Sequence, residues 1–333
     1  MNKEELKKIK LFVGPMSKNI VDSVIDFSNK FNINIGFIPS RRQIDFDSGY
    51  VNNWTTRTFS NYVKSKNKNI IIERDHGGPL QGEDIDDGFA SMFQDCINFD
   101  IIHIDVWKKY QNFNDGVNKT IQYINYCYSL NNNILFEIGT EEGIRKTSVE
   151  ELEEFLARLN AFLPENIFNQ IVYLVIQDGT ALNGSNNIGS YDSQKLKEMI
   201  EISNQYGLLN KIHNGDYVNV EEIHDRFDNG LNAINIAPEF GLIETNAILE
   251  VINNYSFTLN TLYNICFNSG RWKKWVNESF VPEDNKLELI KICGHYVISN
   301  PETEKITHYF KNKISDIVKK ETFKKLSNIL KVG

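Results

Sequence analysis

Short runs of apolar, mostly β-branched or aromatic residues recur along the chain, and longer amphipathic stretches separate them. Such runs are typical of buried β-strands, and the stretches between them have helical periodicity. Eight runs predict strands, at Lys10–Val13, Ile33–Ile38, Asn69–Glu73, Ile101–Ile104, Ile134–Ile138, Ile171–Ile176, Asn210–His213 and Ala233–Ile236. The predicted helices include Asn19–Lys30, Asp84–Cys96, Asp115–Leu130, Val149–Phe162, Ser193–Tyr206 and Val220–Phe227.

This alternation predicts an α/β fold. Continuous apolar strands that alternate with helices indicate parallel pairing with both faces of the sheet covered. Eight such units fit a TIM (β/α)₈ barrel, which we predict for residues 1–265. A doubly wound open sheet is the alternative, but no GxGxxG motif follows the first strand. Residues 266–333 predict additional C-terminal helices packed on the barrel. They end in a basic amphipathic helix at about Glu321–Leu330, which we expect to be a docking face; a membrane anchor is the alternative.

Composition then narrows the class of protein. The chain has 333 residues, of which 41% are hydrophobic and 24% are charged, as in ordinary globular proteins. Its net charge of −8 argues against a general nucleic-acid-binding surface. No apolar run approaches the roughly 18 residues of a membrane span. Scattered cysteines and the absence of an apolar leader lead us to expect a cytoplasmic protein without nucleic-acid or membrane partners.

Polar residues at the ends of the predicted strands form a candidate site, since the chemistry of a TIM barrel lies at the carboxyl ends of its strands. Asp75 and His76 follow the third strand, Glu137 ends the fifth and His213 ends the seventh. Two imidazoles and a carboxylate suit Zn²⁺ or a similar divalent ion. We therefore predict His76, Glu137 and His213 as metal ligands and Asp75 as a proton carrier. A structural hydrogen-bonded Asp75-His76 pair and a loop-capping role for Glu137 are the alternatives.

Further polar residues near these ends are candidates for substrate binding. An arginine at a barrel strand end is a common anion clamp, which makes Arg42 a candidate; a solvated Arg41-Arg42 pair is the alternative. We expect His103 to be structural and to point away from Asp105, and His295 to lie at the surface or in a satisfied core. The polar loop at 183–190 is expected to influence specificity. The substrate-binding candidates are Lys18, Arg42, Gln43, Asp105, Gln177, Asp178, Asp216 and Glu239.

One segment resembles a known family. Ser40–Trp54 is similar to the second-strand segment of the Z-type subunits of class II D-tagatose-1,6-bisphosphate aldolase. Three further stretches match the family in the same order along the chain: Asp75–Pro79, Ile138–Glu141 and His213–Tyr217. Weaker support comes from His103-Ile104-Asp105, Ala237-Pro238 and Gly294-His295-Tyr296. The resemblance implies a TIM barrel of the class II aldolase superfamily.

The resemblance also implies roles for individual residues. Asp75 would be the acid/base, His76 and His213 would bind the metal, and Glu137 would lie near it. Catalytic class II aldolases carry another ligand histidine in a turn just after strand six. The corresponding turn here, Gly179–Gly184, reads Gly-Thr-Ala-Leu-Asn-Gly and contains no histidine.

Three functions follow as hypotheses. The first is a metal-dependent aldolase or epimerase, with zinc as the expected ion, acting on a phosphorylated ketose through an enediolate. Arg42, Lys18 and backbone amides after strands seven and eight would hold the phosphate. The second is a non-catalytic subunit that stabilises a partner aldolase, as the Z-type resemblance implies; a homo-oligomer also stays open. The third is a sugar-phosphate-binding protein without turnover. The joint presence of acid, histidines and glutamate favours the enzyme.

Overall fold

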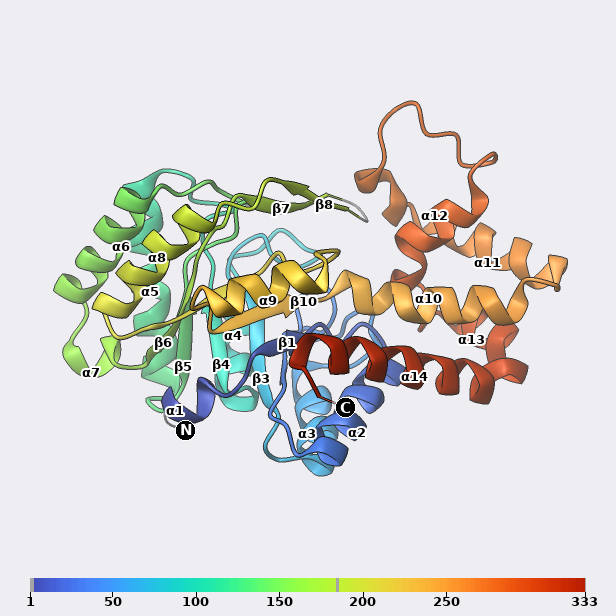
Figure 1. The fold of residues 1–333 in the computed structure, drawn as a ribbon, viewed down its shortest axis with the longest axis horizontal. Coiled ribbons are helices and arrows are strands. Elements are labelled where there is room, and N and C mark those ends of the chain that lie inside the picture. Colours follow the sequence, from blue (N-terminus) through green and yellow to red (C-terminus); the bar gives the residue numbers. More distant parts are fainter. Residues whose placement is uncertain (1–2, 184–185, 333) are drawn as a thin grey trace.

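The computed structural model describes residues 3–183 and 186–332. Eight parallel strands close into a barrel in the order β1-β10-β9-β6-β5-β4-β3-β2 (Figure 1). The predicted TIM barrel is thus confirmed. The second strand is much shorter than predicted. The strands are β1 Leu11–Val13, β2 Gly36–Phe37, β3 Ile71–Gly77, β4 Ile101–Ile104, β5 Leu135–Ile138, β6 Ile171–Val175, β9 Leu209–Ile212 and β10 Ala233–Ile236.

Helices surround the barrel and connect its strands. Their starts follow ordinary capping chemistry, as at α6, where Ser148 and Glu151 form the capping box that the sequence indicates. The helix expected from Asp84 begins only at Phe89, because Gly88 has a non-helical φ of 78°. A hairpin of β7 (Thr180–Asn183) and β8 (Asn186–Gly189) precedes α8. The helices are α1 Lys3–Leu6, α2 Lys18–Phe31, α3 Thr56–Lys66, α4 Phe89–Asn98, α5 Phe113–Leu130, α6 Val149–Phe162, α7 Glu165–Phe168, α8 Ser193–Gln205, α9 Val220–Asp228 and α10 Pro238–Ile252.

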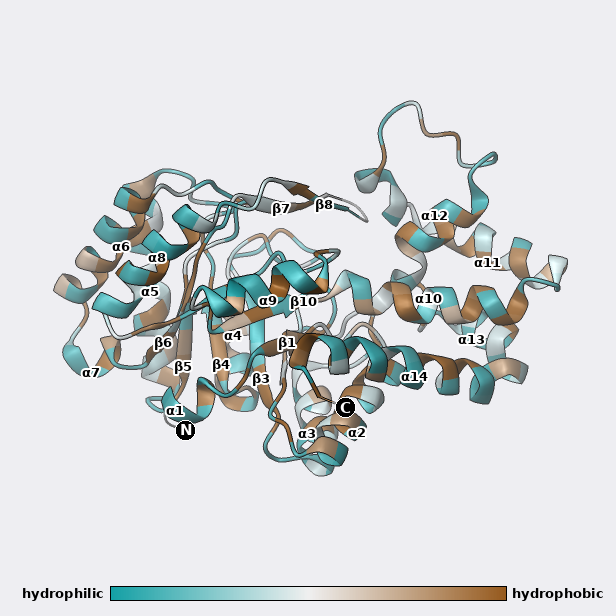
Figure 2. Ribbon diagram, viewed as in Figure 1, coloured by the Kyte–Doolittle hydropathy of each residue, from teal (hydrophilic) through white to brown (hydrophobic). Residues whose placement is uncertain are grey.

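Apolar side chains fill two regions, one between the strands and the surrounding helices and one inside the barrel. Figure 2 shows the apolar strands enclosed by helices whose outer faces are hydrophilic. The inner region includes Leu6 and Ile9 from the N-terminal segment, packed against Phe12 and Tyr173. The Tyr173 hydroxyl donates a hydrogen bond to the Leu6 carbonyl at 3.1 Å. The N-terminal segment therefore plugs one end of the barrel interior.

Additional helices follow the barrel, as predicted from the sequence. The last of them, α14, packs along α2 and α10 (Figure 1), with the rings of Phe27 and Phe323 5.2 Å apart. The basic helix expected at Glu321–Leu330 is the second half of α14, and the boundary expected after residue 265 falls inside α11. The added elements are α11 Ser256–Ser269, η1 Arg271–Trp275, α12 Lys286–Cys293, η2 Gly294–Tyr296, α13 Pro301–Thr307, η3 His308–Phe310 and α14 Lys311–Leu330.

Among the residues that the structure describes, no helix has the length and apolarity needed to cross a membrane.

Strand β3 is anchored to its surroundings by a buried arginine. Arg74 is fully buried, and its guanidinium makes two hydrogen bonds to the Asp95 carboxylate, at 2.8 Å and 2.7 Å. It also donates to the carbonyls of Pro39 and Ile44, at 2.9 Å and 2.7 Å. One side chain therefore ties β3 to α4 and to the loop that follows β2.

We expect the substitution Arg74→Met to lower the free energy of unfolding by about 3–5 kcal/mol, because Asp95 would be left buried and unpaired. Urea unfolding would measure the change. The control is Lys319→Met, which breaks a half-exposed ion pair with Asp26 and should cost less than about 1 kcal/mol. Equal effects of the two substitutions would contradict an anchoring role for Arg74.

Candidate active site

Asp75 and His76 are consecutive residues, yet both face the same space because β3 is irregular at this point. The register between β3 and β4 shifts between Arg74 and Gly77, and His76 has a φ of 48°. Residues other than glycine seldom adopt such a conformation, and it tends to occur at functional sites. The backbone N–H of His76 donates to Nδ1 of His103 at 3.2 Å. His103 therefore helps to hold the irregular segment.

The turn after His76 requires glycine. Gly78 has a φ of 148°, and a Cβ at this residue would lie only 2.4 Å from the carbonyl oxygen of Asp105. A larger residue would push the end of β3 away from β4. The Gly-Gly-Pro sequence after the Asp-His pair thus reflects the close approach of two strand ends.

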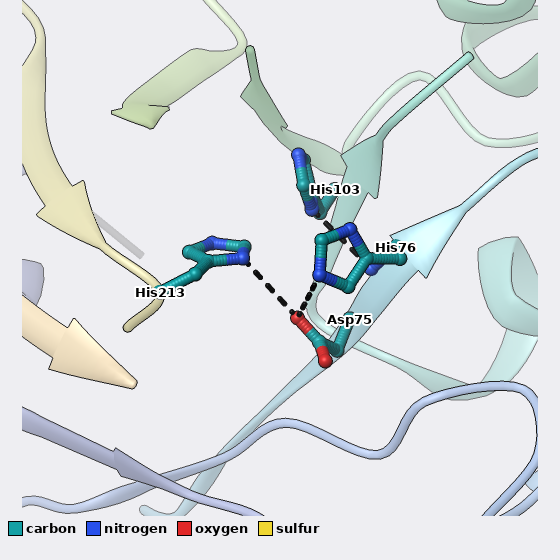
Figure 3. A group of neighbouring side chains, drawn as sticks. All are labelled: Asp75, His76, His103 and His213. Atoms are coloured by element: carbon teal, nitrogen blue, oxygen red, sulfur yellow. Dashed lines mark hydrogen bonds and ion pairs between the residues drawn. The ribbon is translucent and has the colours of Figure 1, made fainter. Parts of the chain in front are cut away.

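Four side chains meet at the carboxyl end of the barrel: Asp75, His76, His103 and His213 (Figure 3). One nitrogen or oxygen atom from each lies within 4.8 Å of those of the others. The expectation that His103 points away from Asp105 is wrong, since both contact His76. Residues two apart in a strand lie on the same face, so His103 and Asp105 point to the same side.

The hydrogen bonds of these side chains show which atoms remain for a ligand. His76 uses Nδ1 for Asp105 Oδ2, at 2.6 Å, and His213 uses Nε2 for Glu137 Oε2, at 3.2 Å. His213 Nδ1 then faces Asp75 Oδ1 at 3.5 Å, and neither of these buried atoms has a hydrogen-bond partner among the described residues. Buried polar atoms are seldom left unpaired, so these two fit a divalent cation between them.

His103 is near this group, but its ring is already engaged. Its Nδ1 accepts the hydrogen bond from His76, and its Nε2 lies 3.1 Å from the carbonyl oxygen of Gly139. The atoms facing one another without such a bond are therefore His76 Nε2, His213 Nδ1 and Asp75 Oδ1. Together they offer two imidazoles and one carboxylate.

Glu137, which was predicted to be a metal ligand, lies behind His213 instead of among the four. Its Oε2 faces His213 and also pairs with the Lys211 ammonium at 3.1 Å. Lys211 in turn pairs with Glu73 at 2.6 Å, and all three side chains of this ion cluster are buried. A carboxylate in this position orients a ligating imidazole from its outer side.

The electrostatics of the site favour a cation. Burial alone would lower the pKa of His76, but the carboxylates of Asp75, Asp105 and Glu141 outweigh it and raise the pKa to about 10. Burial, together with the positive charge of His76, lowers the pKa of His213 well below its usual value. His213 is therefore a neutral imidazole, the form that binds metals, whereas His76 would release its Nε2 proton on binding one.

The side chains of Asp75, His76, Glu141 and His213 form part of the wall of a cavity of about 180 Å³. Asp105 supports His76 from the side. Lys18 pairs with Asp22 on α2 at 2.6 Å and borders a different pocket, because α2 runs along the outside of the barrel. The predicted residues that line the cavity are Arg42, Gln43, Asp75, His76, His213 and Asp216.

Three other substrate-binding candidates are occupied by contacts within the protein. The Gln177 amide donates to backbone carbonyls of the loop after β5, at 3.0 Å and 2.8 Å. Asp178 accepts from Arg226 Nε at 2.6 Å, and Glu239 accepts from the Tyr217 backbone N–H at 2.8 Å. These side chains order the loops around the cavity.

The cavity also contains residues that the sequence analysis did not single out. Asn235 is buried, and neither its amide nitrogen nor its amide oxygen has a partner among the described residues. It is the single polar residue within the apolar run Ala233–Ile236, a signal that could have marked it. His295 and Tyr296 line the cavity from η2, and the Gly-His-Tyr segment of the family resemblance pointed to them.

Leu182 on β7 lines the cavity from the segment after strand six. The family resemblance implies a histidine in this segment in catalytic members, so an apolar side chain occupies this part of the wall. Of the loop expected to influence specificity, residues 186–189 form β8, whereas residues 184 and 185 lie outside the described part of the chain.

Comparison with known proteins gives structural matches only. No family model and no curated protein matches the sequence. A probable tagatose 6 phosphate kinase from Sinorhizobium meliloti is similar in structure, with 15% identity, a TM-score of 0.77, and coverage of 96% of this chain and 98% of that one. A fructose-bisphosphate aldolase from Campylobacter jejuni has 12% identity, a TM-score of 0.63, and coverage of 99% and 92%. The YdjI aldolase from Escherichia coli has 13% identity, a TM-score of 0.57, and coverage of 98% and 94%.

The chain therefore shares its fold with these solved structures, two of which are named aldolases. The matches extend over nearly the whole chain, the C-terminal helices included. The fold implied by the family resemblance is therefore confirmed.

We expect His213→Ala to weaken zinc binding by more than about 100-fold, because loss of a ligand should exceed the roughly 10–100-fold effect of removing an outer-shell partner. Glu137→Gln should fall within that smaller range, since Glu137 contacts the ring and not the ion. Calorimetric titration of the metal-stripped protein would measure both. The control is His224→Ala on α9, whose ring contacts backbone carbonyls at the end of α14. Unchanged zinc affinity in His213→Ala would contradict this metal site.

Proposed function

We propose that the protein is a metal-dependent enzyme that cleaves or forms a carbon–carbon bond in a phosphorylated ketose. The observation that carries the proposal is the set of three inward-facing atoms, His76 Nε2, His213 Nδ1 and Asp75 Oδ1, in a cavity at the carboxyl end of the barrel. Active sites of TIM barrels lie at that end. The superfamily fold supports the reaction class by analogy.

His76 and His213 would hold the divalent ion, with Asp75 beside it. Two imidazoles and a carboxylate are a donor set that zinc accepts, which makes zinc the proposed ion. When bound, the ion would polarise the ketose carbonyl and stabilise negative charge on its oxygen. Asp105 and Glu137 would orient the two rings from their outer sides.

Asp75 would carry the proton. Burial raises the pKa of Asp75 above its usual value, which suits a group that must both take up and return a proton near neutral pH. In the cleavage direction Asp75 would take the proton from the hydroxyl next to the breaking bond. The carbon–carbon bond would break, giving an aldehyde and an enediolate. Addition of the enediolate to the opposite face of the aldehyde, with return of the proton, would give an epimer.

A non-catalytic role as a stabilising subunit of a partner aldolase is the second candidate. It is favoured by Leu182, which lines the cavity in the segment where the family resemblance places a ligand histidine. In that case the paired histidines would bind an ion or a sugar phosphate without turnover.

We expect the chain alone, supplied with zinc, to turn over at least one member of a panel of ketose phosphates and to lose this activity when zinc is removed. Asp75→Asn should lower the rate by about 10²–10⁴-fold, the usual contribution of a positioned acid or base. Asp316→Asn on the exposed face of α14 is the control. Bound zinc should be measured in the same preparations, because Asp75 also faces the proposed ion.

Two results would separate the candidates. Activity that appears only after an aldolase is added, and that survives Asp75→Asn, would contradict the enzyme and support the stabilising subunit. Loss of activity in Asp75→Asn at unchanged zinc content would support the proton-carrying role specifically.

A further inference from the structure

The C-terminal helices contribute to the wall of the cavity. Lys274 of η1 and Tyr296 of η2 line it together with Arg42, which follows β2. Figure 1 shows the β7–β8 hairpin reaching across the barrel toward these helices, and Leu182 of that hairpin lines the same cavity. The histidines and the C-terminal lysine therefore face one common space.

Two arginines near Tyr296 share one acidic partner: Arg42 lines the cavity, and Arg271 lies 5.7 Å from the centre of the Tyr296 ring. Arg271 donates to Oε1 of Glu83 at 2.7 Å, and Arg42 Nε lies 4.0 Å from the same oxygen. The remaining hydrogen bond of Arg42, to the Gly82 carbonyl, is long at 3.5 Å. A single carboxylate thus serves two guanidinium groups.

Lys274 adds a third positive charge, and no ion pair of its ammonium is found among the described residues. The ammonium instead lies over the rings of Trp275 and Tyr296, 4.4 Å and 5.2 Å from their centres. Partial desolvation and the positive charges of Arg42 and Arg271 lower the pKa of Lys274 to about 8. Its ammonium is therefore repelled by its neighbours.

We propose that this mouth, defined by Arg42, Arg271 and Lys274, binds the anionic group of the substrate. Arginine and lysine are the side chains that recognise phosphate and carboxylate. Three cations are grouped here with one carboxylate, Glu83, although the chain as a whole carries a net charge of −8. Glu83 would compete with the anion for the two arginines.

This inference rests on the proposed function and refines it. The phosphate was expected to be held by Arg42, Lys18 and backbone amides of the barrel. Lys18 instead lies outside the cavity, and the C-terminal turn η1 supplies the additional cations. The substrate would then span the cavity, with its anionic end at the C-terminal helices and its reacting carbons beside Asp75.

The test is calorimetric binding of inorganic phosphate to the full chain without metal. We expect Lys274→Ala to weaken phosphate binding about tenfold and Lys274→Arg to restore most of it. Glu83→Gln should strengthen binding, because it frees the arginines. Lys273→Ala, which removes the neighbouring exposed lysine of the same turn, is the matched control and should change affinity less than twofold. Equal effects of Lys274→Ala and Lys273→Ala would overturn the proposal.

A second arm identifies the anion and separates this proposal from the catalytic one. Binding of D-glucuronate that depends on Lys274, without binding of phosphate, would assign the mouth to a carboxylate sugar. Phosphate binding that persists in His213→Ala, a variant expected to lose metal, would support the mouth independently of the metal site. If an active substrate is found and its KM is unchanged in Lys274→Ala, the anion site is overturned while the proposed reaction stands.

Discussion

The site depends on one backbone irregularity, the shifted register of β3 between Arg74 and Gly77. In a regular strand, consecutive side chains point to opposite faces, so Asp75 and His76 could not face the same cavity. The left-handed backbone of His76 turns its ring inward. The backbone N–H of His76 then donates a hydrogen bond to the imidazole of His103. A strained residue persists only where its surroundings over-determine it. Here Arg74 on one side and His103 on the other provide that constraint.

A buried ion cluster next to the ring of His213 also constrains the geometry of the site. Lys211 bridges Glu73 and Glu137, and Glu137 reaches His213. Buried ion pairs of this kind add little net stability, because desolvation offsets their attraction. Their effect is on geometry and charge instead. They fix the ring of His213 and, through the positive Lys211, help to keep it neutral. Glu137 and Lys211 in the barrel interior therefore orient His213, whereas Asp105 orients His76.

The sequence predicted the barrel because its strands are continuous apolar runs, and it predicted the Asp-His pair because strand ends are the natural place for chemistry. It could not show that Glu137 faces the outer side of His213, since residue spacing does not tell which ring atom a neighbour reaches. It also missed Lys274, which lies far along the chain and meets the barrel only through packing of α10, η1 and η2. Asn235 could have been found, because a lone amide in an apolar strand needs a reason.

Leu182 lines the cavity in the segment where the family resemblance implies a ligand histidine, so the proposed metal would be held by two imidazoles and a carboxylate. Two imidazoles and a carboxylate hold catalytic zinc in some hydrolases and iron(II) in some oxygenases, so this donor set does not by itself select one metal. What this chain adds is negative charge, since Asp75, Asp105 and Glu141 all act on His76. A cation placed there would be attracted by these three carboxylates, and the apolar Leu182 would keep water from one side. With no histidine in this segment, substrate positioning would rest on groups outside the proposed metal site, which is the role proposed for Arg42, Arg271 and Lys274.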